Sequence, residues 1–310
     1  MKVDVSMIDM ELRGAGRFFG YIYNILSEAR VRTFPRFKMT EEYIERKDGT
    51  KLRICIFRPK KTCRDVPGLL WIHGGGYSMG SPEESKILIE RFIAARDCVV
   101  VAPDYRLSVE APYPAARLDC YEALLWMRDH CRELGIRENQ LMVGGDSAGG
   151  GLTAAVTLYA RDRKEVAIAF QMPLYPMIDD RMTTESSRDN NAPIWNSEQN
   201  YNGWKLYLGE LFGKPDVPYY AAPARAEDLS GLPPAVTLVG DLEPFRDETV
   251  QYVEKLKKAG VPVEFKLFKG CYHAFEQMCP LARVSRRAVR FLTDAFRRAA
   301  DNYFAEQVPV

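Results

Sequence analysis

The segment Gly145–Gly149, with the sequence GDSAG, constrains the fold of this chain more than any other stretch. It follows residues 141–143, an apolar run typical of a buried strand, and precedes the small residues of 150–158, which favour a closely packed helix. A G-x-S-x-G turn between a strand and a helix exposes its serine, here Ser147, because the flanking glycines let the two elements approach closely. The helix that begins at Ala148 would also direct free N–H groups toward the serine. Since the motif alone should occur by chance in roughly one chain of this length in ten, it needs support from other residues.

The second feature is the glycine run His73–Gly76, which follows the apolar stretch 68–72. Attack of a serine on an acyl group creates an oxyanion, and backbone N–H groups are donors that cost no side-chain entropy to position. An HGGG run after a strand and upstream of the serine turn is the expected source of such donors, together with the Ala148 N–H. His73 itself is expected to orient this loop.

Only three histidines could serve as the base that a serine hydroxyl requires. His73 belongs to the glycine loop, and His130 falls in a predicted helix over 121–134, where a surface position is expected. His273 remains, in a loop directly after the predicted strand 263–268. The end of such a strand is where an α/β fold presents catalytic groups, so His273 is the predicted base.

The acid of a Ser–Asp/Glu–His triad must lie between Ser147 and His273, after a strand. The predicted strand 235–240 is followed by Asp241 and Glu243. Because these residues are two apart, strand periodicity does not separate them, and both are candidates.

Five blocks resemble the hormone-sensitive-lipase branch of the α/β-hydrolase esterases. They are His73–Gly76, Asp104–Leu107 with Pro112–Ala116, Gly145–Gly150, Glu243–Glu248 and Gly270–Phe275. The resemblance implies an α/β-hydrolase fold, a mostly parallel central sheet with helices on both faces and a helical cap. It places the oxyanion donors at the amides of Gly75, Gly76 and Ala148. It also favours Glu243, which stands where that family usually has Asp, with Asp241 as the alternative.

The rest of the chain fits this architecture. Lys47–Thr50 is a hairpin signal between strands at 41–46 and 52–57. Further strands are predicted near 68–72, 98–102, 140–144, 166–171, 235–240 and 263–268, and helices near 83–96, 115–134, 149–162, 245–259 and 281–300. We therefore expect a catalytic domain over 41–179 and 226–310, cap helices over 1–40, and a cap insertion over 180–225.

The insertion 180–225 is polar and rich in aromatic residues, which is typical of a functional subdomain. From it we expect Trp195 and Trp204 to contact substrate, together with Tyr77 and Asp146 of the catalytic domain. In the N-terminal segment, Phe18, Phe19, Ile22, Ile25 and Leu26 form an apolar stripe at helical spacing. We expect this stripe to pack on the body of the protein rather than on a membrane.

Composition excludes several classes of function. The 310 residues carry a net charge of +1 without a basic block, which argues against nucleic-acid binding. The seven cysteines are an odd number without a C-x-x-C pair, which indicates reduced thiols in the cytosol rather than disulfides or a metal site. The N-terminus does not resemble a signal peptide, and no stretch suits stable membrane insertion. We expect that the protein needs no cofactor and no metal and that its substrate is a small ester. A homodimer is possible from the sequence.

The predicted activity is that of a serine carboxylesterase on small or short-acyl esters. A carbohydrate acetyl esterase (deacetylase) or an amidase would use the same residues and differ only in the leaving group. A non-catalytic small-molecule receptor is the alternative from another class, although the intact Ser147 and His273 argue against it. The balanced charge and the lack of a strong interfacial segment make a long-chain lipase a weaker alternative.

Overall fold

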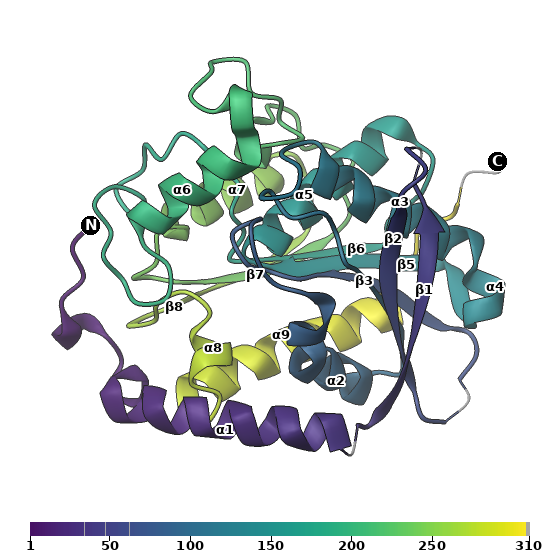
Figure 1. Cartoon of the computed structure of the whole chain (residues 1–310), viewed down its shortest axis with the longest axis horizontal. Helices are drawn as coiled ribbons and strands as arrows, with labels where there is room; N and C mark the ends of the chain where they lie inside the picture. Colours follow the sequence, from purple (N-terminus) through teal and green to yellow (C-terminus); the bar gives the residue numbers. More distant parts are fainter. Residues whose placement is uncertain (34, 47, 62, 308–310) are drawn as a thin grey trace.

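Eight strands form one sheet at the centre of the computed structural model, which describes residues 1–33, 35–46, 48–61 and 63–307 (Figure 1). The strands are β1 (Phe37–Glu45), β2 (Lys51–Pro59), β3 (Val66–Ile72), β4 (Val99–Pro103), β5 (Ile136–Asp146), β6 (Phe170–Leu174), β7 (Ala235–Gly240) and β8 (Val263–Phe268). Their order is β1-β2-β4-β3-β5-β6-β7-β8. The β1–β2 and β2–β4 pairs are antiparallel and all others are parallel, which confirms the predicted sheet.

Helices cover both faces of this sheet, as predicted. The α-helices are α1 (Gly14–Thr33), α2 (Lys86–Ala95), α3 (Ala115–Asp129), α4 (Cys131–Leu134), α5 (Ala148–Arg163), α6 (Ser197–Leu208), α7 (Arg246–Lys258), α8 (Phe275–Met278) and α9 (Arg283–Asn302). Short 3₁₀ turns are η1 (Val5–Met7), η2 (Met10–Leu12), η3 (Pro82–Ser85), η4 (Gly209–Leu211) and η5 (Pro223–Arg225). In Figure 1, α1, α2, α8 and α9 lie below the sheet, and α3, α5, α6 and α7 lie above it.

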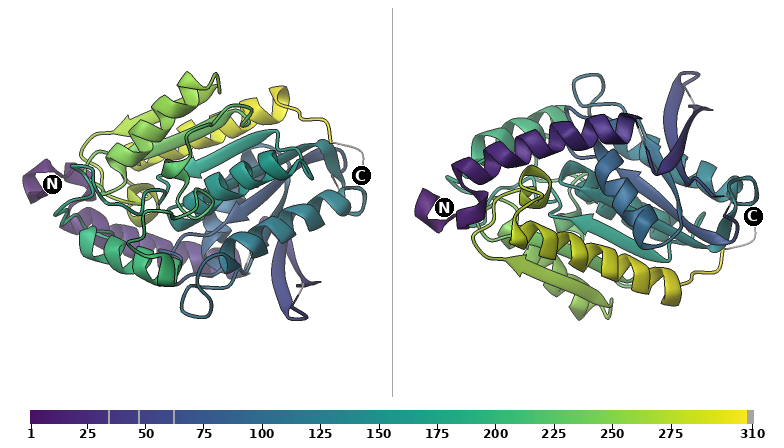
Figure 2. Two further views of the ribbon diagram at one scale, coloured as in Figure 1. Left: turned by 90° about the horizontal axis from the view of Figure 1, so that it is seen from above. Right: turned by 90° about the horizontal axis from the view of Figure 1, so that it is seen from below.

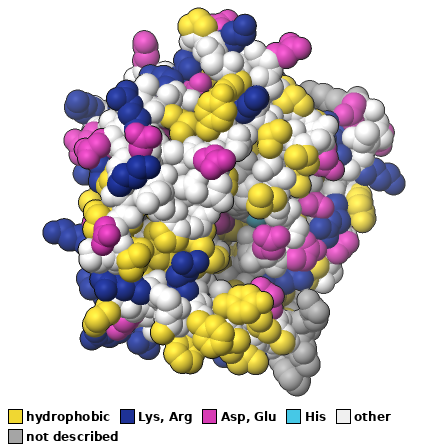
Figure 3. Space-filling model, turned by 60° about the vertical axis from the view of Figure 1, so that its left-hand side comes forward, with side chains coloured by type: hydrophobic (Ala, Val, Ile, Leu, Met, Phe, Trp, Pro, Cys, Tyr) yellow, Lys and Arg dark blue, Asp and Glu magenta, His cyan; other side chains and the backbone are white. Residues whose placement is uncertain are grey.

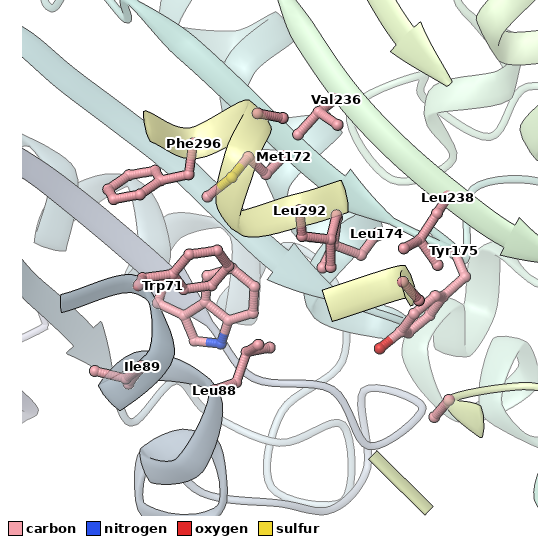
Figure 4. Close-up of a cluster of buried hydrophobic side chains, with 14 of the residues drawn as sticks. Trp71, Leu88, Ile89, Met172, Leu174, Tyr175, Val236, Leu238, Leu292 and Phe296 are labelled. Atoms are coloured by element: carbon pink, nitrogen blue, oxygen red, sulfur yellow. The ribbon is translucent and has the colours of Figure 1, made fainter. Parts of the chain in front are cut away.

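Alternation along the central strands explains this layering. In β3, Leu69 and Trp71 belong to the core below the sheet, while Leu70 and Ile72 belong to the core above it. Successive side chains of a strand point to opposite faces, so an apolar run such as β3 needs helices on both. Figure 4 shows the lower core, where Trp71 and the β6 and β7 side chains meet Leu88 and Ile89 of α2 and Leu292 and Phe296 of α9.

Several predicted boundaries differ from the structure. The strand expected at 166–171 is β6 at 170–174, and the helix expected at 115–134 is divided at His130 into α3 and α4. The ring of His130 stacks on Trp126 and its Nδ1 bonds to the Trp126 carbonyl, which ends α3 locally. The hairpin is confirmed by the β1–β2 pairing, although Lys47 of its turn lies outside the described residues.

The prediction for the apolar stripe of the N-terminal helix is wrong. Phe18, Phe19, Ile22, Ile25 and Leu26 are all exposed on α1. None of the helices described combines the length and apolar character needed to cross a bilayer. All seven cysteines are free thiols.

Candidate active site

Ser147 occupies a strained turn between β5 and α5. Its backbone angles are φ 58° and ψ −119°, a region that residues other than glycine rarely adopt. A Cβ atom on Gly149 would lie 2.1 Å from the Ile72 carbonyl oxygen, and one on Gly145 would lie 2.5 Å from it. The Ser147 N–H donates to the Leu174 carbonyl at 3.0 Å, which fixes the turn against β6. Both glycines of the motif are therefore required by the close approach of the backbone.

A continuous hydrogen-bonded chain joins Ser147, His273 and Glu243. The Nε2 of His273 lies 2.9 Å from the Ser147 Oγ, and its Nδ1 contacts the Glu243 carboxylate. The other carboxylate oxygen of Glu243 accepts a 2.9 Å hydrogen bond from the Gly240 N–H. The relative exposures of the three residues are 6%, 4% and 0% for Ser147, His273 and Glu243. They follow β5, β8 and β7, three parallel strands whose carboxyl ends meet at one edge of the sheet.

Asp241, the alternative acid, has other partners. Its Oδ1 accepts hydrogen bonds from the N–H groups of Gly270 (2.7 Å) and Cys271 (3.3 Å). This carboxylate therefore braces the loop that carries His273, whereas Glu243 contacts the imidazole.

The glycine loop lies directly against the serine turn. A Cβ on Gly74 would come within 2.9 Å of an Asp146 carboxylate oxygen and 3.3 Å of the Ser147 Cβ. Gly75 and Gly76 have φ angles of +115° and +58°, which glycine adopts without strain. Within the described chain, neither of their N–H groups has a protein partner. Ala148 is the first residue of α5, where helix N–H groups lack intrahelical partners.

The side chain of His73 stabilises the conformation of this loop. Its ring stacks on Tyr105 with centroids 4.2 Å apart, and its Nδ1 bonds to the Gly74 carbonyl at 2.7 Å. The Tyr105 hydroxyl donates to the His73 carbonyl at 3.0 Å. Burial lowers the pKa of His73 to about 4, so the ring is neutral near physiological pH.

The four residues predicted to contact substrate lie in three different surroundings. Trp195 packs on the glycine loop, since a Cβ on Gly76 would lie 2.3 Å from its Cη2, and its ring centroid is 6.4 Å from that of His273. By contrast, Tyr77 and Trp204 are buried in the packing beneath α6, and the Tyr77 hydroxyl donates to the Met177 carbonyl. Tyr77 is 1% exposed and Trp204 is 0% exposed, and a role of these two side chains in substrate contact stays a prediction.

Asp146, the fourth residue, belongs to a polar network that the sequence motifs do not reveal. Gln277 donates from its Nε2 to Asp146 (3.2 Å) and to the Tyr175 hydroxyl (2.8 Å), and that hydroxyl donates to Glu276 (2.5 Å). Burial raises the pKa of Asp146 to about 6 and that of Glu276 to about 7, despite these hydrogen bonds. The ring of Tyr175 also meets that of His273 edge to face at 5.0 Å. In the sequence, the only indication of this network was that Glu276 and Gln277 closely follow His273.

The described residues contain one trio with spacing suited to a metal ion: Glu41, Cys55 and Glu83. The Arg53 guanidinium already donates to both of its carboxylates, at 3.3 Å for Glu41 and 2.7 Å for Glu83. Arg53 therefore balances the negative charge of the Glu41 and Glu83 carboxylates.

Comparison with known proteins supports an esterase lineage. The model of a family with the alpha/beta hydrolase fold matches residues 69–277. Esterase LipI of Mycobacterium tuberculosis is 36% identical over 69% of this chain and 68% of its own length, and an arylesterase of Saccharolobus solfataricus is 34% identical over 73% of each chain. The solved structure of a bacterial heroin esterase superposes with a TM-score of 0.85 at 35% identity, covering 96% of this chain and 99% of the other. The chain therefore belongs to the α/β-hydrolase fold family, in its hormone-sensitive-lipase branch of esterases.

Proposed function

We propose that this protein is a serine carboxylesterase that hydrolyses small or short-acyl esters with Ser147, His273 and Glu243. The observation that carries the proposal is the unbroken contact from the Ser147 Oγ through both ring nitrogens of His273 to the Glu243 carboxylate. The relatives named above are esterases, which supports the same substrate class. No observation on this chain favours a sugar ester or an amide over a simple carboxylic ester.

The geometry suits acyl transfer in two stages. His273 accepts the Ser147 proton at Nε2 while the Oγ attacks the ester carbonyl carbon. Glu243 accepts the hydrogen bond from Nδ1–H, which fixes the tautomer and stabilises the imidazolium that forms. The imidazolium then protonates the departing alkoxide, leaving an acyl-enzyme. Water attacks this ester with His273 again as the base. The imidazolium then returns the proton to the departing Ser147 Oγ, and the carboxylic acid leaves.

The N–H groups of Gly75, Gly76 and Ala148 are the proposed oxyanion donors. The glycine loop, which contains Gly75 and Gly76, lies against the serine turn, and Ala148 directly follows Ser147 at the start of α5. Donors fixed in the backbone stabilise the developing charge without reorganising during the reaction.

Residues 180–225 are proposed to act as the cap. Within this segment, Trp195 packs on Gly76, and Trp204 and Tyr207 of α6 pack on Tyr77 directly after the glycine loop. The N-terminus contacts this segment through its first residues, since the Met1 ammonium donates to the carbonyls of Glu185 and Arg188 and the Val3 N–H donates to Asn191. Because Ser147 and His273 are nearly covered, such a cap would exclude water and limit the size of the acyl group. The cytosolic location and the homodimer stay predictions.

A panel of nitrophenyl esters from acetyl to palmitoyl, assayed with wild type and with Ser147→Ala, tests the proposal. Short esters should be hydrolysed best, and Ser147→Ala should lower kcat by at least about 10³-fold. Ser285→Ala, a buried serine on α9, is the matched control and should keep its activity. Equal hydrolysis by wild type and Ser147→Ala would contradict the catalytic assignment, and a wild type that binds but never cleaves esters would favour the receptor.

A further inference from the structure

Helix α1 is oriented with its apolar side outward. Its large apolar residues between positions 18 and 26 are each 36% to 64% exposed: Phe18, Phe19, Tyr21, Ile22, Tyr23, Ile25 and Leu26. The side that faces the protein consists mainly of small or polar residues: Gly16, Gly20, Asn24, Ser27 and Val31. A surface helix of a globular protein normally shows the opposite arrangement.

Specific contacts fix this orientation. A Cβ on Gly20 would lie 2.1 Å from the Met278 carbonyl oxygen, so the α1 backbone rests directly on α8. The Asn24 side chain donates to the Gln277 carbonyl at 2.8 Å. Turning the helix to bury its aromatic residues would break this hydrogen bond and separate the two backbones. The outward apolar face is therefore built into the packing of the helix.

The exposed apolar surface extends beyond α1. Val5, Met7, Met10 and Leu281 are 64%, 44%, 79% and 49% exposed. Apolar side chains gather at the foot of the molecule in Figure 3, and the right-hand view of Figure 2, seen from below, shows α1, α2 and α9 together on this underside. Exposed apolar side chains gathered on one side of a protein in this way are typical of an interaction site.

Cationic side chains border this surface. Tyr23 of α1 shares a groove of about 740 Å³ with Arg91, Arg286 and Arg290. Met10 shares a second groove, of about 770 Å³, with Lys269 and Arg287. The first groove is lined by four arginines and one acid, Asp294, and the second by four cations and two acids, Asp9 and Glu11, so positive charge predominates in both.

We propose that the α1 docking face, defined as the exposed side chains of α1 with Arg286, Arg287 and Arg290 of α9, binds the surface of a membrane that contains anionic lipids. Aromatic and aliphatic residues on one side of a helix with arginines beside it suit the boundary between headgroups and acyl chains. The arginines supply the attraction to lipid phosphates. Two copies packed through antiparallel α1 helices would instead bring these arginines toward each other, which like charges oppose. The α1 docking face would rest on the membrane surface without crossing the bilayer. This binding is separate from the proposed ester hydrolysis.

Flotation of the full-length protein with phosphatidylcholine vesicles, with and without phosphatidylglycerol, tests the proposal. The wild type should float with the anionic vesicles and be released by high salt. Phe18→Ser/Phe19→Ser and Arg286→Gln/Arg290→Gln should each lower the partition coefficient at least about tenfold. Tyr43→Ser on β1 and Lys257→Gln/Lys258→Gln on α7 are the matched controls, since they change exposed residues on other elements. Both controls should bind like the wild type.

Hydrolysis of a water-soluble ester should be unchanged in all four variants, which separates docking from catalysis and shows that the variants are folded. Absence of flotation, or equal flotation of wild type and both α1-face variants, would overturn the proposal. Sedimentation showing a dimer that Phe18→Ser/Phe19→Ser abolishes, without vesicle binding, would assign the face to a second copy of the chain and overturn it as well.

Discussion

The Oδ1 atom of Asp241 accepts a 2.7 Å hydrogen bond from the Gly270 N–H, so this carboxylate fastens the loop that carries His273 without contacting the imidazole. Glu243, two residues later, contacts the imidazole itself and is anchored by the Gly240 N–H. Two neighbouring acids thus have separable tasks: one holds the loop and the other meets the ring.

Replacing each acid by its amide should distinguish these tasks. Glu243→Gln should lower kcat on nitrophenyl acetate by about 10³–10⁴-fold, because the imidazolium loses its partner and the tautomer is no longer fixed. Asp241→Asn should lower kcat by less than about tenfold and act mainly on the thermal midpoint, since it weakens a loop contact. Steady-state kinetics and thermal unfolding of both variants provide the measurement. A crippled Asp241→Asn beside an active Glu243→Gln would reverse the assignment.

Gly76→Ala should disable the site through a steric conflict with Trp195. The new Cβ would lie 2.3 Å from the indole Cη2, and displacement of the loop would move a proposed oxyanion donor. We expect kcat to fall by about 10²–10³-fold. Gly260→Ala is the matched control, because Gly260 also has a positive φ, of +79°, but open space around it. That change should cost about 1–2 kcal/mol of stability and leave kcat unchanged.

If the steric conflict is the cause, adding Trp195→Ala to Gly76→Ala should restore part of the lost kcat. A double variant as inactive as Gly76→Ala alone would indicate that the backbone, and not the indole, is at fault.

Glu276→Gln should alter how stability depends on pH. The folded-state pKa of Glu276 is about 7, against about 4.3 for an unfolded chain. Between these values the folded state keeps a proton that the unfolded state has lost, so this residue makes the free energy of unfolding decrease as pH rises. The variant should therefore gain stability relative to wild type from pH 5 to 8, by roughly 1–3 kcal/mol. Urea denaturation across this range measures the difference, with Glu254→Gln on the exposed side of α7 as control.

His73→Gln should show the opposite sign. Burial lowers the folded-state pKa of His73 to about 4, whereas an unfolded histidine titrates near 6.5. Between these values the unfolded state binds the extra proton, so wild type loses stability as pH falls from 6.5 toward 4. The stability difference between wild type and His73→Gln should shrink as the pH falls through this window. A difference that stays constant with pH would show that His73 does not remain neutral in the fold, and His130→Gln serves as the control for a partly exposed ring.

Motif spacing was enough to predict the sheet and the meeting of Ser147 and His273 with an acid after β7, and the family resemblance favoured Glu243 as that acid. Parallel strands place their carboxyl ends at one edge, so loops after β5, β7 and β8 had to converge. Periodicity did not separate Asp241 from Glu243, because their difference lies in the course of the loop. Hydrogen-bond geometry separated them.

Other features were beyond the reach of the pattern. The stripe on α1 predicted an apolar face correctly, but periodicity cannot tell whether such a face points inward, and the contacts of Gly20 and Asn24 turn it outward. The sequence also did not reveal that Tyr77 and Trp204 pack on each other, because aromatic rings bury most surface in this way. The network of Glu276, Gln277 and Tyr175 has no motif, since it joins segments about one hundred residues apart.

The left-handed backbone of Ser147 has a consequence for anyone who engineers this protein. Holding a serine at φ 58° and ψ −119° costs the fold roughly 1–3 kcal/mol, a strain that glycine would largely remove. A variant library ranked by heat resistance alone would therefore enrich replacements at the position of the proposed nucleophile. Screens for a more durable enzyme should score turnover and melting together, because at this residue the two objectives oppose each other.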